Sequence, residues 1–194
     1  VLSVVTSHCP LVGDQLEGLE PWSQLCLVIM YEYALEQKSF WYPYLHHFLP
    51  LHPTTPPTPF APLFWEEAKL KYLLGTECYE KIQQQHEEIN EQWPRLHRCF
   101  LDHEELFGAH FAKICTKQFF SYVCFVVQSY SFTLDEESLP ALKDCCDLES
   151  LMGMCPMADA LNHKTGFNNA RLFTHGDERE EEEAENSSKH AEDV

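Results

Sequence analysis

The chain has 194 residues and a hydrophobic fraction of 44%, enough for one ordinary domain with a core of its own. Its formal net charge of -18, with only 13 lysines and arginines, argues against a nucleic-acid-binding surface, because phosphates require clustered positive charge. No apolar run is long enough to span a bilayer, and residues 1–10 lack a secretory signal. We therefore expect a soluble, intracellular protein without a membrane or nucleic-acid partner.

The cysteines favour neither a disulfide framework nor a metal site. There are nine of them, an odd number, and they are scattered along the chain without any C-x-x-C pair. Cys145 and Cys146 are adjacent, but no second pair at metal-ligand spacing accompanies them. The sequence therefore predicts reduced thiols and no bound metal.

The first elements in chain order are a strand and a helix. "VLSVV", residues 1–5, has the branched residues of a strand, but nothing nearby could pair with it, so we expect further sequence upstream. A helix is predicted over 21–38, where Pro21 suits the first helical position and apolar residues recur on one face. Residues 39–65 are rich in proline and aromatic residues, which indicates a packed but irregular connection.

Three further helices are predicted. A short one lies within "FWEEAKLKYLLGT", residues 64–76, and Gly75 suits the position just past its end. A long amphipathic helix over 77–98 should be kinked or ended by Pro94. A third, starting from "DHEE" at 102–105 and running through 109–132, is apolar on nearly every side, which is typical of a central buried helix.

The remaining residues are mostly polar or acidic. An acidic loop is expected over 133–150, followed by "PMADALNHKTGFNNARLF" at 156–173, where polar residues crowd between two apolar runs as they do in a ligand-binding segment. Between Asp177 and Asp193 there are nine acids and two basic residues. Such a run repels itself, so we expect a disordered insert or tail, with electrostatic steering of a basic protein as the functional alternative.

These motifs together resemble those of SET-domain protein lysine methyltransferases in the subclass whose SET fold is split by a helical lobe. "PMADALNHKTGFNNARLF" resembles the family's Asn-His motif, and "SFWYPYLHHFLP", "FWEEAKLKYLLGT" and "SYSF" resemble, in order, pieces of the lobe in the Rubisco and ribosomal-protein branches. The resemblance implies a mainly α chain with short pieces of the β-rich SET domain at both ends, within a complete α+β protein.

The resemblance also implies domain boundaries. Residues 1–20 would end the first SET segment and 21–132 would form the helical lobe. The acidic loop, 133–150, would lead to the second SET segment at 151–173, which carries the Asn-His motif. The acidic insert or tail would occupy 174–194.

The implied activity is methyl transfer from S-adenosyl-L-methionine to a lysine amine. By resemblance, the side-chain carbonyl of Asn162 would accept from the cofactor's ammonium, and the backbone of His163 could match the N6 donor and N7 acceptor of adenine. Trp41 matches a family tryptophan near the cofactor and substrate pocket, although ordinary core packing is its alternative. Tyr130 would also lie at the cofactor.

Two residues are assigned to the substrate pocket. Phe132 ends "SYSF", where the last helix of the lobe meets the active site in the family. Asp159 could anchor the loop of the Asn-His motif, while a helix cap or a surface position is its alternative. Many family members carry arginine where this chain has Tyr130, and this departure favours the nuclear and ribosomal-protein branches.

The family's Gly-rich turn and its transfer-site tyrosine are not in this sequence, so no catalytic residue can be named and the chain is interpreted as a fragment, incomplete and inactive alone. We expect the complete protein to be a monomeric enzyme of the nucleus or cytoplasm that methylates a basic protein, with a ribosomal protein favoured. Whether this chain itself is an enzyme stays open. The alternative is a non-catalytic helical module that binds basic proteins.

Overall fold

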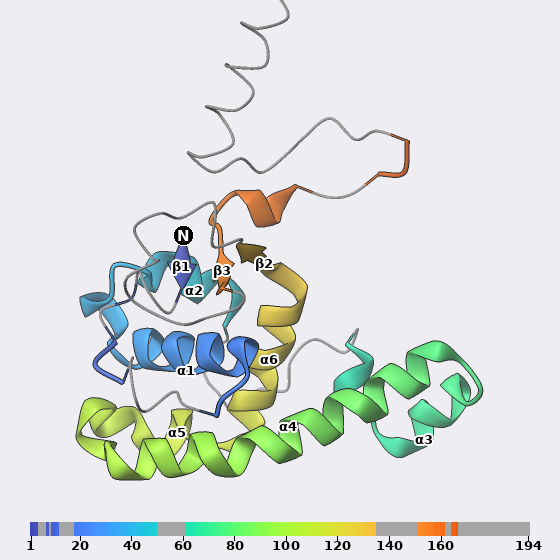
Figure 1. The fold of residues 1–194 in the computed structure, drawn as a ribbon, viewed down its shortest axis with the longest axis horizontal. Helices are drawn as coiled ribbons and strands as arrows, with labels where there is room; N and C mark the ends of the chain where they lie inside the picture. The colour runs from blue at the N-terminus through green and yellow to red at the C-terminus, as the bar shows by residue number, and fades with distance from the viewer. Residues whose placement is uncertain are drawn as a thin grey trace, which may run out of the picture.

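The computed structural model describes residues 1–3, 7, 9–11, 18–49, 61–134, 151–161 and 164–166. This part of the chain is mainly α-helical with one small sheet, which confirms the predicted fold class (Figure 1). The α-helices are α1 Pro21–Ala34, α2 Tyr42–Phe48, α3 Glu67–Leu70, α4 Glu77–Asp102, α5 Phe111–Ile114 and α6 Lys117–Tyr130. The strands are β1 Leu2–Ser3, β2 Ser131–Leu134 and β3 Leu151–Met154, and 3-10 turns such as η2 Glu36–Lys38 and η9 Ala158–Ala160 connect the elements.

The central helix is α1, whereas the sequence favoured 109–132 for this position. Almost every side chain of α1 is buried, because α2, α4, α5, α6 and β3 all pack against it. By contrast, α6 keeps one polar side in water, where Lys117, Gln118 and Gln128 are exposed. The apolar run "LCLVIM" at 25–30 was the sequence signal for burial on all sides.

The long helix α4 forms one side of the molecule, with α3 beside its N-terminal end (Figure 1). Thr76 caps it by accepting from the backbone N–H of Tyr79 at 3.3 Å. Of the two effects predicted for Pro94, a kink or an end of the helix, the end is wrong, because the helix continues to Asp102. Pro94 and Asn90 are both exposed, so water can reach the Asn90 carbonyl that the proline leaves without its helical donor.

The segment predicted as one helix over 109–132 is two helices. After the turn η6 Gly108–His110, helix α5 ends at Ile114, and α6 begins again at Lys117. Thr116 starts α6 by accepting from the backbone N–H of Phe119 at 3.2 Å. A threonine favours a helix cap over a helix interior, because its hydroxyl competes for backbone groups.

The region predicted to be irregular over 39–65 contains helix α2 and the turn η3 Pro62–Phe64. Pro43 lies in the first turn of α2, where its missing N–H would have no helical partner anyway. The predicted irregularity of this part is therefore wrong, because a proline in the first turn does not break a helix. Residues 50–60 of this region lie outside the described residues.

Segments far apart in the sequence meet in an antiparallel sheet of order β1-β3-β2. Leu2 and Ser131 both lie opposite Met154 on β3, and Phe132 lies opposite Gly153. The expectation that the first strand lacks a partner is therefore wrong, since its partner is β3, about 150 residues further along the chain. The strand β2 directly follows α6. The sheet therefore connects β1 and β3 to the end of the helical region.

A buried carboxylate ties the start of the chain to the helices. Glu32 on α1 is 4% exposed and accepts hydrogen bonds from the hydroxyls of Ser7 at 2.6 Å and Ser39 at 2.5 Å. Each serine oxygen also accepts a backbone N–H, from Cys9 at 3.1 Å and from Trp41 at 3.0 Å. A buried charge requires such partners, because an unpaired one costs several kcal/mol.

Removing this carboxylate should destabilise the protein. We expect Glu32→Ala to lower the free energy of unfolding by about 2–4 kcal/mol, because both buried serine hydroxyls lose their acceptor. Glu80→Ala, at an exposed position of α4, should change it by less than about 0.5 kcal/mol. Urea unfolding followed by circular dichroism measures both, and equal effects would contradict the role of Glu32.

The seven cysteines within the described residues are free thiols, and six of them are buried. Burial raises the pKa of Cys9 and of Cys115 to about 12. Cys78 on α4 is exposed.

Among the described helices, none has the length and apolar character needed to span a membrane.

Alkylation should distinguish the exposed thiol of Cys78 from the buried thiols of Cys9 and Cys115. At pH 8 a thiol of pKa about 12 is a thiolate in only about one molecule in ten thousand, and the thiolate is the reactive form. We expect iodoacetamide to modify Cys78 in the native protein well before Cys9 or Cys115, and all three at similar rates in urea. Peptide mapping by mass spectrometry gives the rates, and rapid native labelling of Cys9 would contradict the buried position.

Candidate functional site

Three segments converge where α2, the end of α6 with β2, and β3 with η9 lie together. Four residues predicted from the family resemblance fall on these segments. Trp41 immediately precedes α2, Tyr130 ends α6, Phe132 lies in β2 and Asp159 lies in η9. All four are half-buried, so each is held in the fold while part of its surface stays accessible. We call this region the junction.

A hydrogen bond holds η9 against α2. The hydroxyl of Tyr44 donates to Oδ2 of Asp159 at 2.5 Å. Burial, followed by the hydrogen bond to Asp159 and the charge of that carboxylate, raises the pKa of Tyr44 well above its usual range. The neutral phenol is therefore the form that anchors the start of the segment containing the Asn-His motif.

Aromatic contacts continue from Tyr44 to the end of α6. The ring centroid of Phe48 lies 5.2 Å from that of Tyr44 and 4.7 Å from that of Tyr130. The hydroxyl of Tyr122 donates to the backbone carbonyl of Phe48 at 2.7 Å, which fixes the end of α2 on α6. Asp159, Tyr44, Phe48 and Tyr130 thus form one connected group, the junction cluster, in which aromatic packing positions a carboxylate.

Trp41 is positioned separately. Its backbone N–H donates to the Ser39 hydroxyl, which in turn donates to Glu32, so the start of α2 is tied to the central helix. Its ring packs edge-to-face on Phe40, with centroids 5.2 Å apart, and also contacts the core. No ring contact within the described residues connects Trp41 with Tyr130.

Asn162 and His163 lie outside the described residues, so their predicted cofactor contacts stay predictions. The segment that leads to them is described as far as Leu161. Met157 there adopts φ 76, a left-handed conformation uncommon for a residue with a side chain, two positions before Asp159. The turn that follows, around Gly166, also has a positive φ of 81.

Sequence reasoning missed Tyr44 and Phe48. Both lie in "SFWYPYLHHFLP", a segment predicted to be irregular, whereas in α2 their spacing of four places them on one helix face. The need of a half-buried aspartate in the predicted Asn-His segment for a hydrogen-bond donor was the sequence signal that pointed to a residue such as Tyr44. Within the described residues, no group of three histidine, cysteine, aspartate or glutamate side chains could hold a metal ion.

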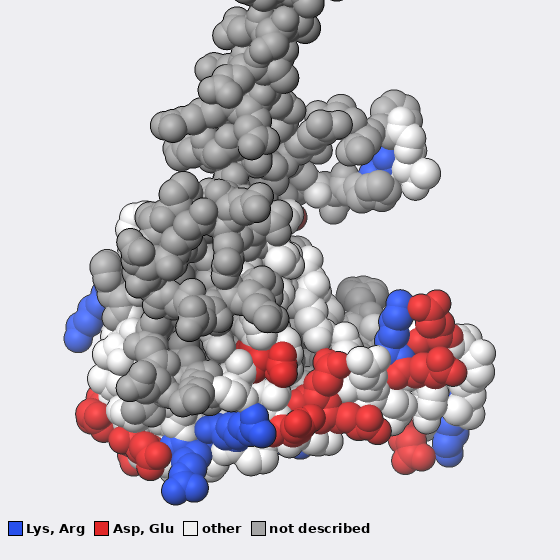
Figure 2. Space-filling view, viewed as in Figure 1, with Lys and Arg blue, Asp and Glu red and all other residues white. Residues whose placement is uncertain are grey.

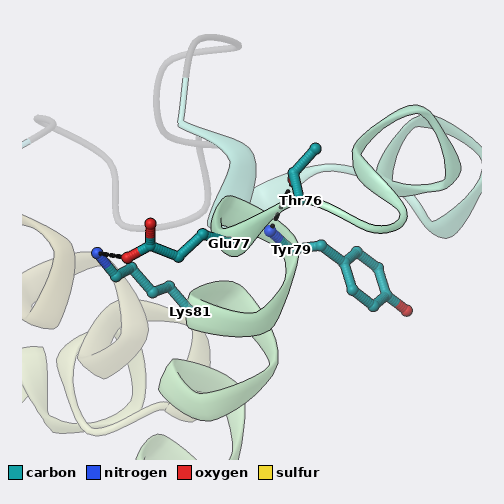
Figure 3. Close-up of polar contacts among 4 residues, drawn as sticks. All are labelled: Thr76, Glu77, Tyr79 and Lys81. Carbon is teal, nitrogen blue, oxygen red and sulfur yellow. Dashed lines mark hydrogen bonds and ion pairs between the residues drawn. The ribbon is translucent and has the colours of Figure 1, made fainter.

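The larger of two described cavities lies away from the junction. It has a volume of about 480 Å³ between α4, α6 and residues 61–63, with Ile82 and Phe125 among its lining residues. At its rim Lys81 pairs with Glu77 at 2.7 Å, one turn apart on α4 (Figure 3). This exposed pair contributes little to stability. None of the predicted site residues lines the cavity.

Comparison with known proteins supports a relationship to lysine methyltransferases. The chain is similar to ribosomal lysine N-methyltransferase 4 of Saccharomyces cerevisiae (strain ATCC 204508 / S288c), with 27% identity over 190 residues that cover 89% of this chain. The chain spans 36% of the length of that relative. No family model matches the chain, and no solved structure matches it significantly.

The hydrogen bond from Tyr44 to Asp159 gives a test of the junction cluster. Because the folded-state pKa of Tyr44 is raised, its contribution to stability is complete below the usual tyrosine pKa of about 10 and is lost as pH rises further. Tyr44→Phe should lower the free energy of unfolding by about 1 kcal/mol at pH 7. It should also remove one late-titrating phenol from the absorbance titration at 295 nm.

Tyr72→Phe is the matched control, since Tyr72 is 88% exposed. It should leave the stability unchanged. If Tyr44→Phe behaved like Tyr72→Phe in both measurements, the hydrogen bond would not hold the junction together.

Proposed function

We propose that the complete protein is an S-adenosyl-L-methionine-dependent protein-lysine N-methyltransferase of the split SET subclass, and that this chain supplies its helical lobe and the adjoining segments. The similarity to a yeast ribosomal lysine methyltransferase along 89% of the chain carries the proposal. The ordered family motifs in the sequence support the subclass. In the sheet, β3 pairs with β1, which precedes the helical region, and with β2, which ends it. This arrangement also fits a lobe inserted into a second fold.

The junction is the proposed site of methyl transfer. S-adenosylmethionine supplies a sulfonium methyl group for in-line displacement by the lysine nitrogen, so the task of the protein is positioning and exclusion of water. The half-buried rings of Trp41 and Tyr130 fit this need, because aromatic faces attract cationic groups such as a sulfonium. Asn162 would accept from the ammonium of the cofactor, and the backbone of His163 would bind adenine.

The substrate side of the site is assigned to Phe132 and Asp159. The half-buried ring of Phe132 would pack along the lysine stem, in surroundings that favour the neutral amine. Asp159 acts through position, since its hydrogen bond to Tyr44 fixes the segment that leads to Asn162 and His163. The target amine must lose a proton before it attacks, so the rate should rise with pH until that amine is deprotonated.

We further propose that the substrate is a basic protein, with a ribosomal protein favoured. The yeast relative is named as a ribosomal lysine N-methyltransferase. The formal charge of -18 would attract a lysine-rich substrate. A monomeric enzyme in the nucleus or cytoplasm would meet such proteins.

The test uses the complete protein with labelled S-adenosylmethionine and purified ribosomal proteins, and maps labelled lysines by mass spectrometry. We expect label on a lysine of a basic protein. Asn162→Ala should weaken cofactor binding in calorimetry by about 1–3 kcal/mol, through loss of a charge-assisted hydrogen bond. Gln118→Ala, at an exposed position of α6, should leave it unchanged.

The result that contradicts the proposal is cofactor binding without label on any lysine, or no cofactor binding at all. Either result, combined with binding of basic proteins, would favour the alternative of a non-catalytic helical binding module. An unchanged dissociation constant for Asn162→Ala would remove Asn162 from the cofactor site.

A further inference from the structure

A second described cavity lies between the start of α1 and the middle of α4. It has a volume of about 310 Å³ and is lined by Glu20, Trp22, Glu88, Glu91 and Gln92. This volume is at the lower end for ligand pockets, so it suits one long side chain better than a whole cofactor. None of the residues assigned to the junction lines this cavity.

The charge of the cavity selects a cation. Three of its five lining residues are glutamates, and acidic side chains gather over the middle of α4 on this face (Figure 2). No lysine or arginine within the described residues forms an ion pair with these glutamates. The guanidinium of the nearby Arg95 is directed to the backbone carbonyl of Gly18. The start of α1 adds only about half a positive charge, which three carboxylates outweigh.

Trp22 makes the cavity suited to an organic cation rather than a metal ion. Its ring stacks on Phe120, with centroids 6.0 Å apart, and Phe120 stacks in turn on Trp93 at 5.6 Å. This packing holds the half-buried indole in place where it lines the cavity. An ammonium or guanidinium gains from an aromatic face, and tryptophan is the most favourable ring for this contact.

Gln92 indicates that the ligand carries a hydrogen-bond acceptor in addition to its positive charge. Its side chain is 4% exposed, and its Oε1 accepts from the backbone N–H of Glu20 at 3.4 Å, which fixes the orientation of the amide. No hydrogen bond within the described residues uses its amide nitrogen, although this residue lines the cavity. The Gln92 amide nitrogen is not one of the buried polar atoms left without a partner, so it is open to the cavity, where it can donate to a ligand carbonyl.

We infer that this cavity binds a lysine or arginine side chain of a basic protein segment, with the cation between the glutamates and Trp22 and a backbone carbonyl on the amide of Gln92. A polyamine offers the cation without the carbonyl, so the Gln92 amide, which is open to the cavity, favours a peptide. The site is separate from the junction and does not depend on methyl transfer. Binding without methylation would support this site while contradicting the proposed function.

The experiment titrates the protein with an acetylated, amidated glycine-lysine peptide at low salt and measures binding by calorimetry. Two comparison ligands are titrated in the same way: the same peptide with norleucine in place of lysine, and spermine. We expect the lysine peptide to bind more tightly than spermine and the norleucine peptide not to bind. The indole N–H resonance of Trp22, assigned with Trp22→Phe, should shift on addition of the lysine peptide.

The variant Glu88→Gln with Glu91→Gln should weaken binding of the lysine peptide by about tenfold. Its control, Glu66→Gln with Glu67→Gln at exposed positions at the start of α3, makes the same change in net charge and should weaken binding by less than about twofold. Equal weakening by both variants, or an unmoved Trp22 resonance, would show that only net charge attracts the peptide and would overturn the site. Tighter binding of spermine than of the peptide would overturn the peptide assignment.

Discussion

The buried carboxylate of Glu32 is the interaction on which the arrangement of the chain depends. It lies on the central helix and binds Ser7, which follows β1, and Ser39, which precedes α2. A carboxyl group at 4% exposure requires such hydrogen-bond partners, so these segments are held in fixed positions relative to α1. Through Ser39 the same carboxylate sets the backbone at Trp41, the first of the proposed site residues.

The junction follows from this arrangement. With α2 fixed at its start, Tyr44 and Phe48 extend from it to Asp159 and Tyr130, and thereby connect residues more than 80 positions apart in the sequence. The β1-β3-β2 sheet adds a second connection between the same segments. A methyl-transfer site needs rigid positioning of two reactants, and a helical lobe that fixes its own neighbours would provide it.

The sequence predicted the parts that depend on local periodicity. The stripe of Ile82, Ile89 and Leu96 gave α4 its buried face, because helical spacing is a local property. Tertiary context decided the rest: Pro94 is tolerated at an exposed position, and β1 pairs with β3, about 150 residues further along the chain. The family resemblance indicated Tyr130 and Asp159, which lie on converging segments. Tyr44 joins them through packing and a hydrogen bond, and this partnership depends on contacts between segments more than 80 residues apart, which local spacing alone does not predict.

Hydrogen–deuterium exchange of the complete protein, with and without S-adenosylmethionine, tests most directly whether the junction is the methyl-transfer site. The account predicts that the cofactor slows exchange together in peptides covering residues 39–49, 130–134 and 151–161, and leaves residues 77–84 at the far end of α4 unchanged. Because exchange reports local opening, coordinated protection would show that the cofactor stabilises these segments as one unit. Unchanged exchange at all three segments in the presence of saturating cofactor would contradict the account.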